Sequence, residues 1–232
     1  MKKIYGEGAI SLIPCNRGFI FTAQQDELPD KMEEQKTEGK TVIAYKQHSF
    51  DDGTNSLVTR SVFLMSKFGA NFEFYFRTLG DYLNCKAIPL ENGNMLIAAH
   101  DGTAAVFSRN NVKKWSGSLK HKGFAPADIA TQGDFLWCSY PENNAIIKYN
   151  INSMQQTFRV GGSASGGIIE PYGLWLNDNR LIITSSANGM IRSLNLDTFY
   201  LDDLWEVSEP AFQYIKVDSN EVVLTKTGIY RL

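Results

Sequence analysis

A degenerate internal repeat of about 40 residues constrains the fold of this chain more than any other feature of its sequence. Four similar apolar runs recur, and their landmark residues are 40, 46 and 41 positions apart: Leu96, Leu136, Ile182 and Val223. Polar turns flank each run. Asp101-Gly102 and Asn188-Gly189 are typical of these turns, because both pairs tolerate the positive φ of a tight hairpin. The repeat therefore indicates hairpin-connected strands rather than helices.

Each repeat continues with two further strands. An alternating strand follows the turn at 105–107, 146–149 and 190–194, and a last strand carries one large aromatic residue: Trp115, Phe158 or Trp205. A four-stranded antiparallel unit of this length is the blade of a β-propeller. We expect the three aromatic side chains to pack within the blades rather than to form a binding surface.

The two ends of the sequence complement each other. The last unit, from about 211 to 232, provides only three strands, and residues 2–5 provide an alternating fourth with Tyr5 in the aromatic position. Pairing the termini within one blade removes an exposed sheet edge. We predict a propeller that the N-terminal strand closes by completing the C-terminal blade.

The first unit is longer than the others. Its strands are predicted at 9–15, 19–22, 61–68 and 72–77, with an insertion at about 25–59 in the connection between the second and third strands. Without the inserted residues about 200 remain, or five blades of about 40. The sequence thus predicts an all-β, single-domain, five-bladed propeller over residues 1–232. The insertion is either a lid or partner-recognition element, or an elongated hairpin without a role.

Three or four of the five units resemble the loose NHL/YVTN-type propeller repeats. The best match runs from Pro126-Ala127-Asp128-Ile129 through 136–139 to 144–149, and a second begins at Pro171-Tyr172-Gly173-Leu174. The resemblance implies a propeller fold and leaves the chemistry open. In the similar gluconolactonase-like propellers an axial metal lies in the central channel, which makes a channel Ca²⁺ one expectation here.

Candidate site residues lie where the chain enters the inner strand of each blade, or in the loops on the same rim. Ligands of such folds bind where several segments converge. The ligand-binding candidates at the channel rim are Glu7, Asp81, Asn84, His100, Asp128, Tyr140, Glu170, Tyr172 and Glu209. Converging carboxylates suit a hard cation such as Ca²⁺. The alternative is that these residues form ordinary solvated turns, since Glu-Pro is itself a turn signal.

Composition narrows the classes of partner. The 23 Lys and Arg residues balance 25 Asp and Glu residues, which gives no basic field for nucleic acid. The apolar runs are too short to cross a membrane, and the three scattered cysteines, Cys15, Cys85 and Cys138, fit a reducing compartment. We expect a cytoplasmic monomer that binds a small molecule or a protein.

The function remains open between three classes. The first is a non-enzymatic binding or interaction module with its ligand or partner at the channel rim, consistent with the absence of catalytic motifs. The second is a metal-dependent lactonase- or lyase-like enzyme with its site in the channel. The third is a carbohydrate-binding propeller, in which Tyr140 and Tyr172 would stack on sugars. No catalytic residue is predicted, because propellers support many functions.

Overall fold

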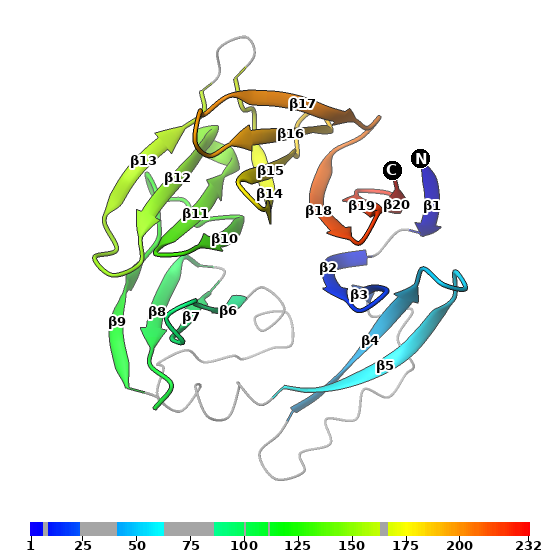
Figure 1. Cartoon of the computed structure of the whole chain (residues 1–232), viewed down its shortest axis with the longest axis horizontal. Helices are drawn as coiled ribbons and strands as arrows, with labels where there is room; N and C mark the ends of the chain where they lie inside the picture. Colours follow the sequence, from blue (N-terminus) through cyan, green and yellow to red (C-terminus); the bar gives the residue numbers. More distant parts are fainter. Residues whose placement is uncertain (7–8, 24–40, 63–85, 100, 111, 163–166) are drawn as a thin grey trace. The chain divides into compact units, whose positions relative to one another are not determined.

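In the residues that the computed structural model describes, five four-stranded antiparallel sheets are the blades of a five-bladed β-propeller, as predicted (Figure 1). The structure describes residues 1–232 except 7–8, 24–40, 63–85, 100, 111 and 163–166. The chain divides into two units: Met1–Tyr75 with Gln213–Leu232, and Phe76–Phe212. Among the described residues, no helix has the length and apolar character needed to cross a membrane.

The first unit contains the sheet that joins the two termini. Its strands are β18 (Ala211–Val217, which starts two residues before the unit), β19 (Asn220–Thr225), β20 (Gly228–Arg231) and β1 (Lys2–Tyr5). β1 pairs antiparallel with β20, with Lys2 opposite Arg231 and Tyr5 opposite Ile229. The prediction that the N-terminal strand completes the C-terminal blade is therefore confirmed.

The other sheet of this unit corrects the strand assignment of the first blade. Its strands are β2 (Ala9–Cys15), β3 (Gly18–Ala23), β4 (Thr41–Ser49) and β5 (Asn55–Val62). The third and fourth strands thus come from residues 41–62, most of which were assigned to the insertion, and not from 61–68 and 72–77. Both segments contain a short, unbroken apolar run, at 42–45 and 62–65, so pattern alone did not separate them. Residues 24–40 and 63–85 lie outside the described residues.

Contacts within the first unit hold these two sheets together. The side-chain amide of Gln213 donates to the Leu12 carbonyl at 2.8 Å and accepts from the Leu12 amide at 2.7 Å. The Tyr5 ring lies 4.5 Å from the Phe21 ring, and the Lys46 ammonium donates to the Tyr5 hydroxyl at 2.7 Å. Tyr5 therefore performs the packing role that its position in the repeat predicts.

Three sheets make up the second unit, and their strand boundaries follow the repeat. The first consists of β6 (Lys86–Pro89), β7 (Met95–Ala98), β8 (Thr103–Phe107) and β9 (Lys113–Ser118). The second consists of β10 (Asp128–Gln132), β11 (Phe135–Tyr140), β12 (Ala145–Asn150) and β13 (Gln156–Val160). The third consists of β14 (Pro171–Asn177), β15 (Arg180–Ser185), β16 (Met190–Asn195) and β17 (Leu201–Glu206).

The core of the second unit lies between neighbouring blades. One cluster joins Leu96 and Val106 to Leu136 and Ile147, and another joins Trp137 to Leu174, Leu181 and related residues. Trp115 and Phe158 pack against these clusters, as predicted. Trp205 does not follow the prediction, because its side chain is 44% exposed.

Candidate functional site

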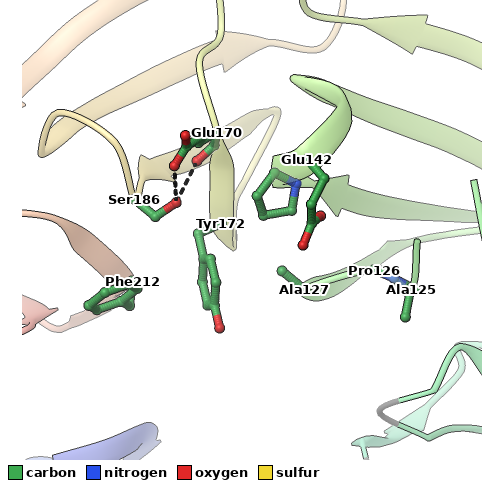
Figure 2. Close-up of a pocket in the computed structure, with 9 residues that line it drawn as sticks. Ala125, Pro126, Ala127, Glu142, Glu170, Tyr172, Ser186 and Phe212 are labelled. Atoms are coloured by element: carbon green, nitrogen blue, oxygen red, sulfur yellow. Dashed lines mark hydrogen bonds between the residues drawn. The ribbon is translucent and has the colours of Figure 1, made fainter. Parts of the chain in front are cut away.

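A surface depression of about 560 Å³ lies in the second unit, where the chain enters β10 and β14 (Figure 2). Segments from several connections line it: Ala125, Pro126, Ala127, Pro141, Glu142, Glu170, Tyr172, Ser186 and Phe212. Three segments that lead into the first strand of a blade, 124–128, 170–173 and 209–213, contribute to this lining. The other contributors, Pro141, Glu142 and Ser186, belong to connections between second and third strands.

Asn144 connects the two loops that carry the acidic residues of the depression. It ends the 3₁₀ turn Pro141–Asn143 in a left-handed conformation with φ of 47°, which asparagine tolerates better than most residues. Its side-chain oxygen accepts a hydrogen bond from the Glu170 amide at 2.8 Å. Glu142 lies within this turn, so its position is coupled to that of Glu170.

The entrance to β14 is also tied to the turn between β15 and β16. The Glu170 carbonyl accepts the Ser186 amide at 3.0 Å, and the Ser186 hydroxyl donates to the Glu170 carboxylate at 3.2 Å. Glu170 itself has a positive φ of 40°. These hydrogen bonds stabilise that uncommon conformation, which places the Glu170 side chain at the surface.

An aromatic pair forms the apolar part of the depression. Pro171 and Gly173 are buried, so the alternation of β14 directs Tyr172 outward, and its side chain is 37% exposed. The Tyr172 ring contacts the half-buried Phe212 edge to face, with the ring centres 5.2 Å apart. Figure 2 shows the two rings beside each other, with the Tyr172 hydroxyl directed away from the strand.

The charges of the lining are of one sign. Glu142 and Glu170 are the only ionisable acids or bases, apart from the Tyr172 hydroxyl, among the lining residues. In Figure 2 the Glu142 carboxylate extends toward the same side as the Tyr172 hydroxyl. Carboxylates beside an exposed aromatic ring can accept hydrogen bonds from a ligand while the ring stacks on its apolar part.

Asp128 has a structural position rather than an open one. Its side chain is 6% exposed, and its two oxygens accept the Ile129 amide at 2.7 Å and the Leu174 amide at 2.8 Å. The Ser139 hydroxyl accepts the Asp128 amide at 3.0 Å and donates to the Tyr172 carbonyl. Asp128 therefore joins β10 to β14 beneath the depression and does not line it.

Tyr140 lies in the core and not at a rim. Its side chain is completely buried, its hydroxyl donates to the Leu119 carbonyl, and the Tyr149 hydroxyl lies 3.2 Å away. Burial is also the main reason that the pKa of Tyr140 is raised far above its usual value. Such a ring is not accessible to a sugar, which corrects the expectation that Tyr140 stacks on a ligand.

The remaining predicted residues do not join the depression. Glu209 is half-buried in the connection between β17 and β18 and is absent from the lining. Glu7, Asp81, Asn84 and His100 lie outside the described residues. Their ligand-binding roles stay predictions.

The sequence analysis did not single out the lining residues Pro141, Glu142, Ser186 and Phe212. Glu142 and Ser186 lie in connections between second and third strands, which share the rim with the entering segments. Phe212 lies within the entering segment 209–213. The repeat places both kinds of segment at the rim, but the predicted candidates were limited to acidic residues, tyrosines, Asn84 and His100.

The described residues do not assemble a metal site. Within them, no group of three or more His, Cys, Asp or Glu side chains is positioned to hold a metal ion. Two of the acidic residues proposed to converge, Glu7 and Asp81, are not among the described residues. The expectation of a channel Ca²⁺ therefore stays a prediction.

Comparison with known proteins supports the fold. No protein-family model matches the chain, and no curated protein matches it. Sqt1 from Saccharomyces cerevisiae is similar with a TM-score of 0.53 and 10% identity, over 97% of this chain and 72% of that chain. A streptogramin B lyase is similar with a TM-score of 0.51 and 10% identity, over 97% of this chain. This chain spans 63% of the length of that lyase. Likeness at this identity defines the class of fold, the β-propeller, and nothing finer.

Proposed function

We propose that the chain is a non-enzymatic β-propeller binding module that holds a small molecule or a segment of a protein partner in the depression at the entrances of β10 and β14. We place it with the NHL-like repeat proteins and in the cytoplasm, acting as a monomer without nucleic-acid or membrane partners. The observation that carries the proposal is the outward Tyr172 ring, 37% exposed beside Phe212 at the edge of a depression of about 560 Å³. An aromatic surface at a concave site with a few fixed polar groups is the usual form of a ligand site.

A carbohydrate is the second candidate occupant. The exposed face of Tyr172 suits stacking on a sugar ring, and the carboxylates of Glu142 and Glu170 suit hydrogen bonds from its hydroxyl groups. This candidate differs from the first only in the ligand, so one experiment compares them.

The experiment records amide NMR spectra of the full chain with neutral aromatic fragments and with glucose, galactose, N-acetylglucosamine and maltose. The proposal predicts that at least one probe shifts the amides of Glu142, Tyr172 and Ser186, and that Tyr172→Ala abolishes those shifts. Tyr200→Ala is the matched control, since it removes an exposed tyrosine elsewhere in the same unit. Shifts caused only by the sugars favour the carbohydrate candidate. If no probe shifts these amides, or if Tyr172→Ala leaves the shifts unchanged, the proposal is wrong.

The metal-dependent lactonase- or lyase-like alternative is tested separately. Elemental analysis of the purified protein and the melting temperature with and without CaCl₂ report a resident metal directly, because a ligand of the native state raises its melting temperature. Bound calcium together with a calcium-dependent melting shift would favour the enzyme over the binding module.

A further inference from the structure

The strand β17 is the outer edge of its blade. In the sheet order β14-β15-β16-β17, one side of β17 pairs with β16, and within the described residues no strand pairs with the other side. Such an edge presents unpaired backbone amides and carbonyls that another extended chain can use. Strand addition to a sheet edge is a common mode of peptide recognition.

The edge carries an unusual amount of exposed apolar surface. Tyr200 and Trp205 are 67% and 44% exposed, and Phe199 and Leu204 are exposed as well. A β-bulge opposite Ile191 and Arg192 interrupts the alternation here, so that Leu204 and Trp205 are both exposed. Neighbouring apolar side chains at the surface of a protein are typical of an interaction site.

The charge of this segment is entirely negative. Residues 197–206 contain four carboxylates and no lysine or arginine: Asp197, Asp202, Asp203 and Glu206. Arg180 binds Asp202 at 3.0 Å, and Arg192 binds Asp203 at 2.7 Å. For Asp197 and Glu206, both exposed, the described part of the chain provides no ion-pair partner. The ends of the segment therefore offer negative charge to a partner.

The other outer strands differ in their charge. The basic residues of those strands are Lys2 and Lys3 in β1, Arg60 in β5, Lys113 and Lys114 in β9, and Arg159 in β13. A basic side chain on an edge strand is a common protection against pairing with other chains. Among the five outer strands, β17 alone has no lysine or arginine, and it would attract a basic chain.

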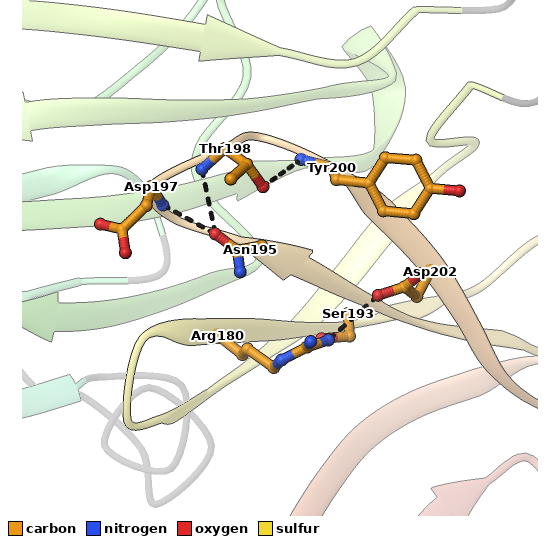
Figure 3. Close-up of polar contacts among 7 residues, drawn as sticks. All are labelled: Arg180, Ser193, Asn195, Asp197, Thr198, Tyr200 and Asp202. Atoms are coloured by element: carbon orange, nitrogen blue, oxygen red, sulfur yellow. Dashed lines mark hydrogen bonds and ion pairs between the residues drawn. The ribbon is translucent and has the colours of Figure 1, made fainter.

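The turn that leads into β17 is ordered by its own hydrogen bonds (Figure 3). The Asn195 side-chain oxygen accepts the Asp197 and Thr198 amides at 3.0 Å each, and the Thr198 hydroxyl accepts the Tyr200 amide at 3.3 Å. Beside it, the Phe199 ring stacks on Phe158 with the ring centres 4.3 Å apart. The edge is thus preorganised, which reduces the entropy that a partner must overcome on binding.

We propose that the outer edge of β17 binds an extended basic segment of a partner protein by strand addition. Main-chain hydrogen bonds join the segment to the edge, its basic side chains lie against Asp197 and Glu206, and its apolar side chains cover Tyr200 and Trp205. This surface is separate from the depression and does not depend on the function proposed for it.

A pair of synthetic peptides tests the proposal on the full chain. The probe is a blocked nonapeptide that alternates lysine and valine, and its counterpart has the same sequence with its internal amides N-methylated on both edges. We expect the first peptide to shift the amides of Leu201–Glu206 and to slow hydrogen exchange at alternate amides there. The N-methylated peptide should bind at least about ten-fold more weakly, because neither of its edges keeps the amide donors that strand addition needs, while its charge is unchanged.

Two variants and an acidic peptide test whether peptide binding depends on the negative charge at β17. Glu206→Lys should weaken binding of the lysine–valine peptide by about five-fold or more, whereas Glu142→Lys, a matched change in the depression, should leave it unchanged. A peptide that alternates glutamate and valine should not bind. Equal binding of the N-methylated or the acidic peptide would overturn the proposal, as would no effect of the lysine–valine peptide at 1 mM. Light scattering could instead show that the chain self-associates and that Trp205→Lys abolishes the association. The occupant of the β17 edge would then be a second copy of this chain and not another protein.

Discussion

The segments that enter β10 and β14 occupy equivalent places in neighbouring blades, yet their carboxylates have opposite surroundings. Asp128 is buried, and both of its oxygens accept backbone amides. Glu170 is exposed, and its carboxylate accepts one hydrogen bond from the Ser186 hydroxyl. When Pro126 is aligned with Pro171, Asp128 corresponds to Gly173 and Glu170 to Ala125. The place of an acidic residue within the entering segment therefore separates a carboxylate that supports the fold from one that faces a ligand.

The largest expected effect is on stability when Asp128 is removed. Asp128→Ala leaves the buried amides of Ile129 and Leu174 without acceptors, so we expect the free energy of unfolding to fall by about 3 kcal/mol or more. Urea denaturation with an unchanged m-value measures it. Glu170→Ala is the control and should cost well under half as much. If the two variants lost equal amounts of stability, the claim that Asp128 supports the fold and Glu170 does not would be contradicted.

Ser139 provides a second test of this comparison, because its hydroxyl connects the segments that enter β10 and β14. Its hydroxyl accepts the Asp128 amide and donates to the Tyr172 carbonyl. Ser139→Ala should lower the free energy of unfolding by about 1–2 kcal/mol, less than Asp128→Ala, because only neutral hydrogen bonds are lost. Because the sites share partners, the double variant should cost less than the sum of the two single changes. Additive losses would show that Ser139 and Asp128 act independently.

For the exposed carboxylates of the depression, we expect substitutions to change ligand binding without changing the stability of the fold. In the double variant Glu142→Gln, Glu170→Gln, the side-chain shapes are kept and both negative charges of the lining are removed. Thermal and urea unfolding should be nearly unchanged, while the affinity of any ligand found in the depression should change several-fold. Marked destabilisation would instead assign these carboxylates to the fold, like Asp128.

The smallest expected effect concerns pH in the first unit, which has no part in the depression. Burial is the main cause that lowers the pKa of His48, against the opposing hydrogen bond to Asn55. Because the folded protein prefers the neutral ring, this contribution to stability is present above the ordinary pKa of 6.5 and is lost as the pH falls below it. The free energy of unfolding should therefore decrease more steeply from about pH 7 to pH 5 in the native chain than in His48→Gln. Parallel pH profiles would contradict this assignment.

The repeat allowed most of the fold to be predicted, because period-two alternation and Asp-Gly or Asn-Gly turns act locally. The completion of the last blade by β1 also followed, since three strands at one end needed a fourth. The first blade was assigned wrongly at its third and fourth strands, because 41–62 and 61–77 both contain short apolar runs that are typical of strands. Nothing local distinguishes the strand that pairs with β3.

The candidate site was predicted only in part, because its chemistry depends on contacts between blades. The sequence identified Glu170 and Tyr172 and the segment that contains Phe212. It did not show that the Leu174 amide would donate a hydrogen bond to the Asp128 carboxylate, or that the Tyr140 side chain would point into the core. Both facts depend on which way a side chain faces, and a shift of one residue along a strand reverses that direction.

Crystallographic fragment soaking tests most directly the proposal that a ligand binds in the depression beside Tyr172. The crystals must leave this face free of lattice contacts. The account predicts that fragments collect against the Tyr172 and Phe212 rings, with polar groups toward Glu142 or Glu170, and that crystals of Tyr172→Ala lose them. Fragments that bind only at other surfaces, with the depression consistently empty, would contradict it.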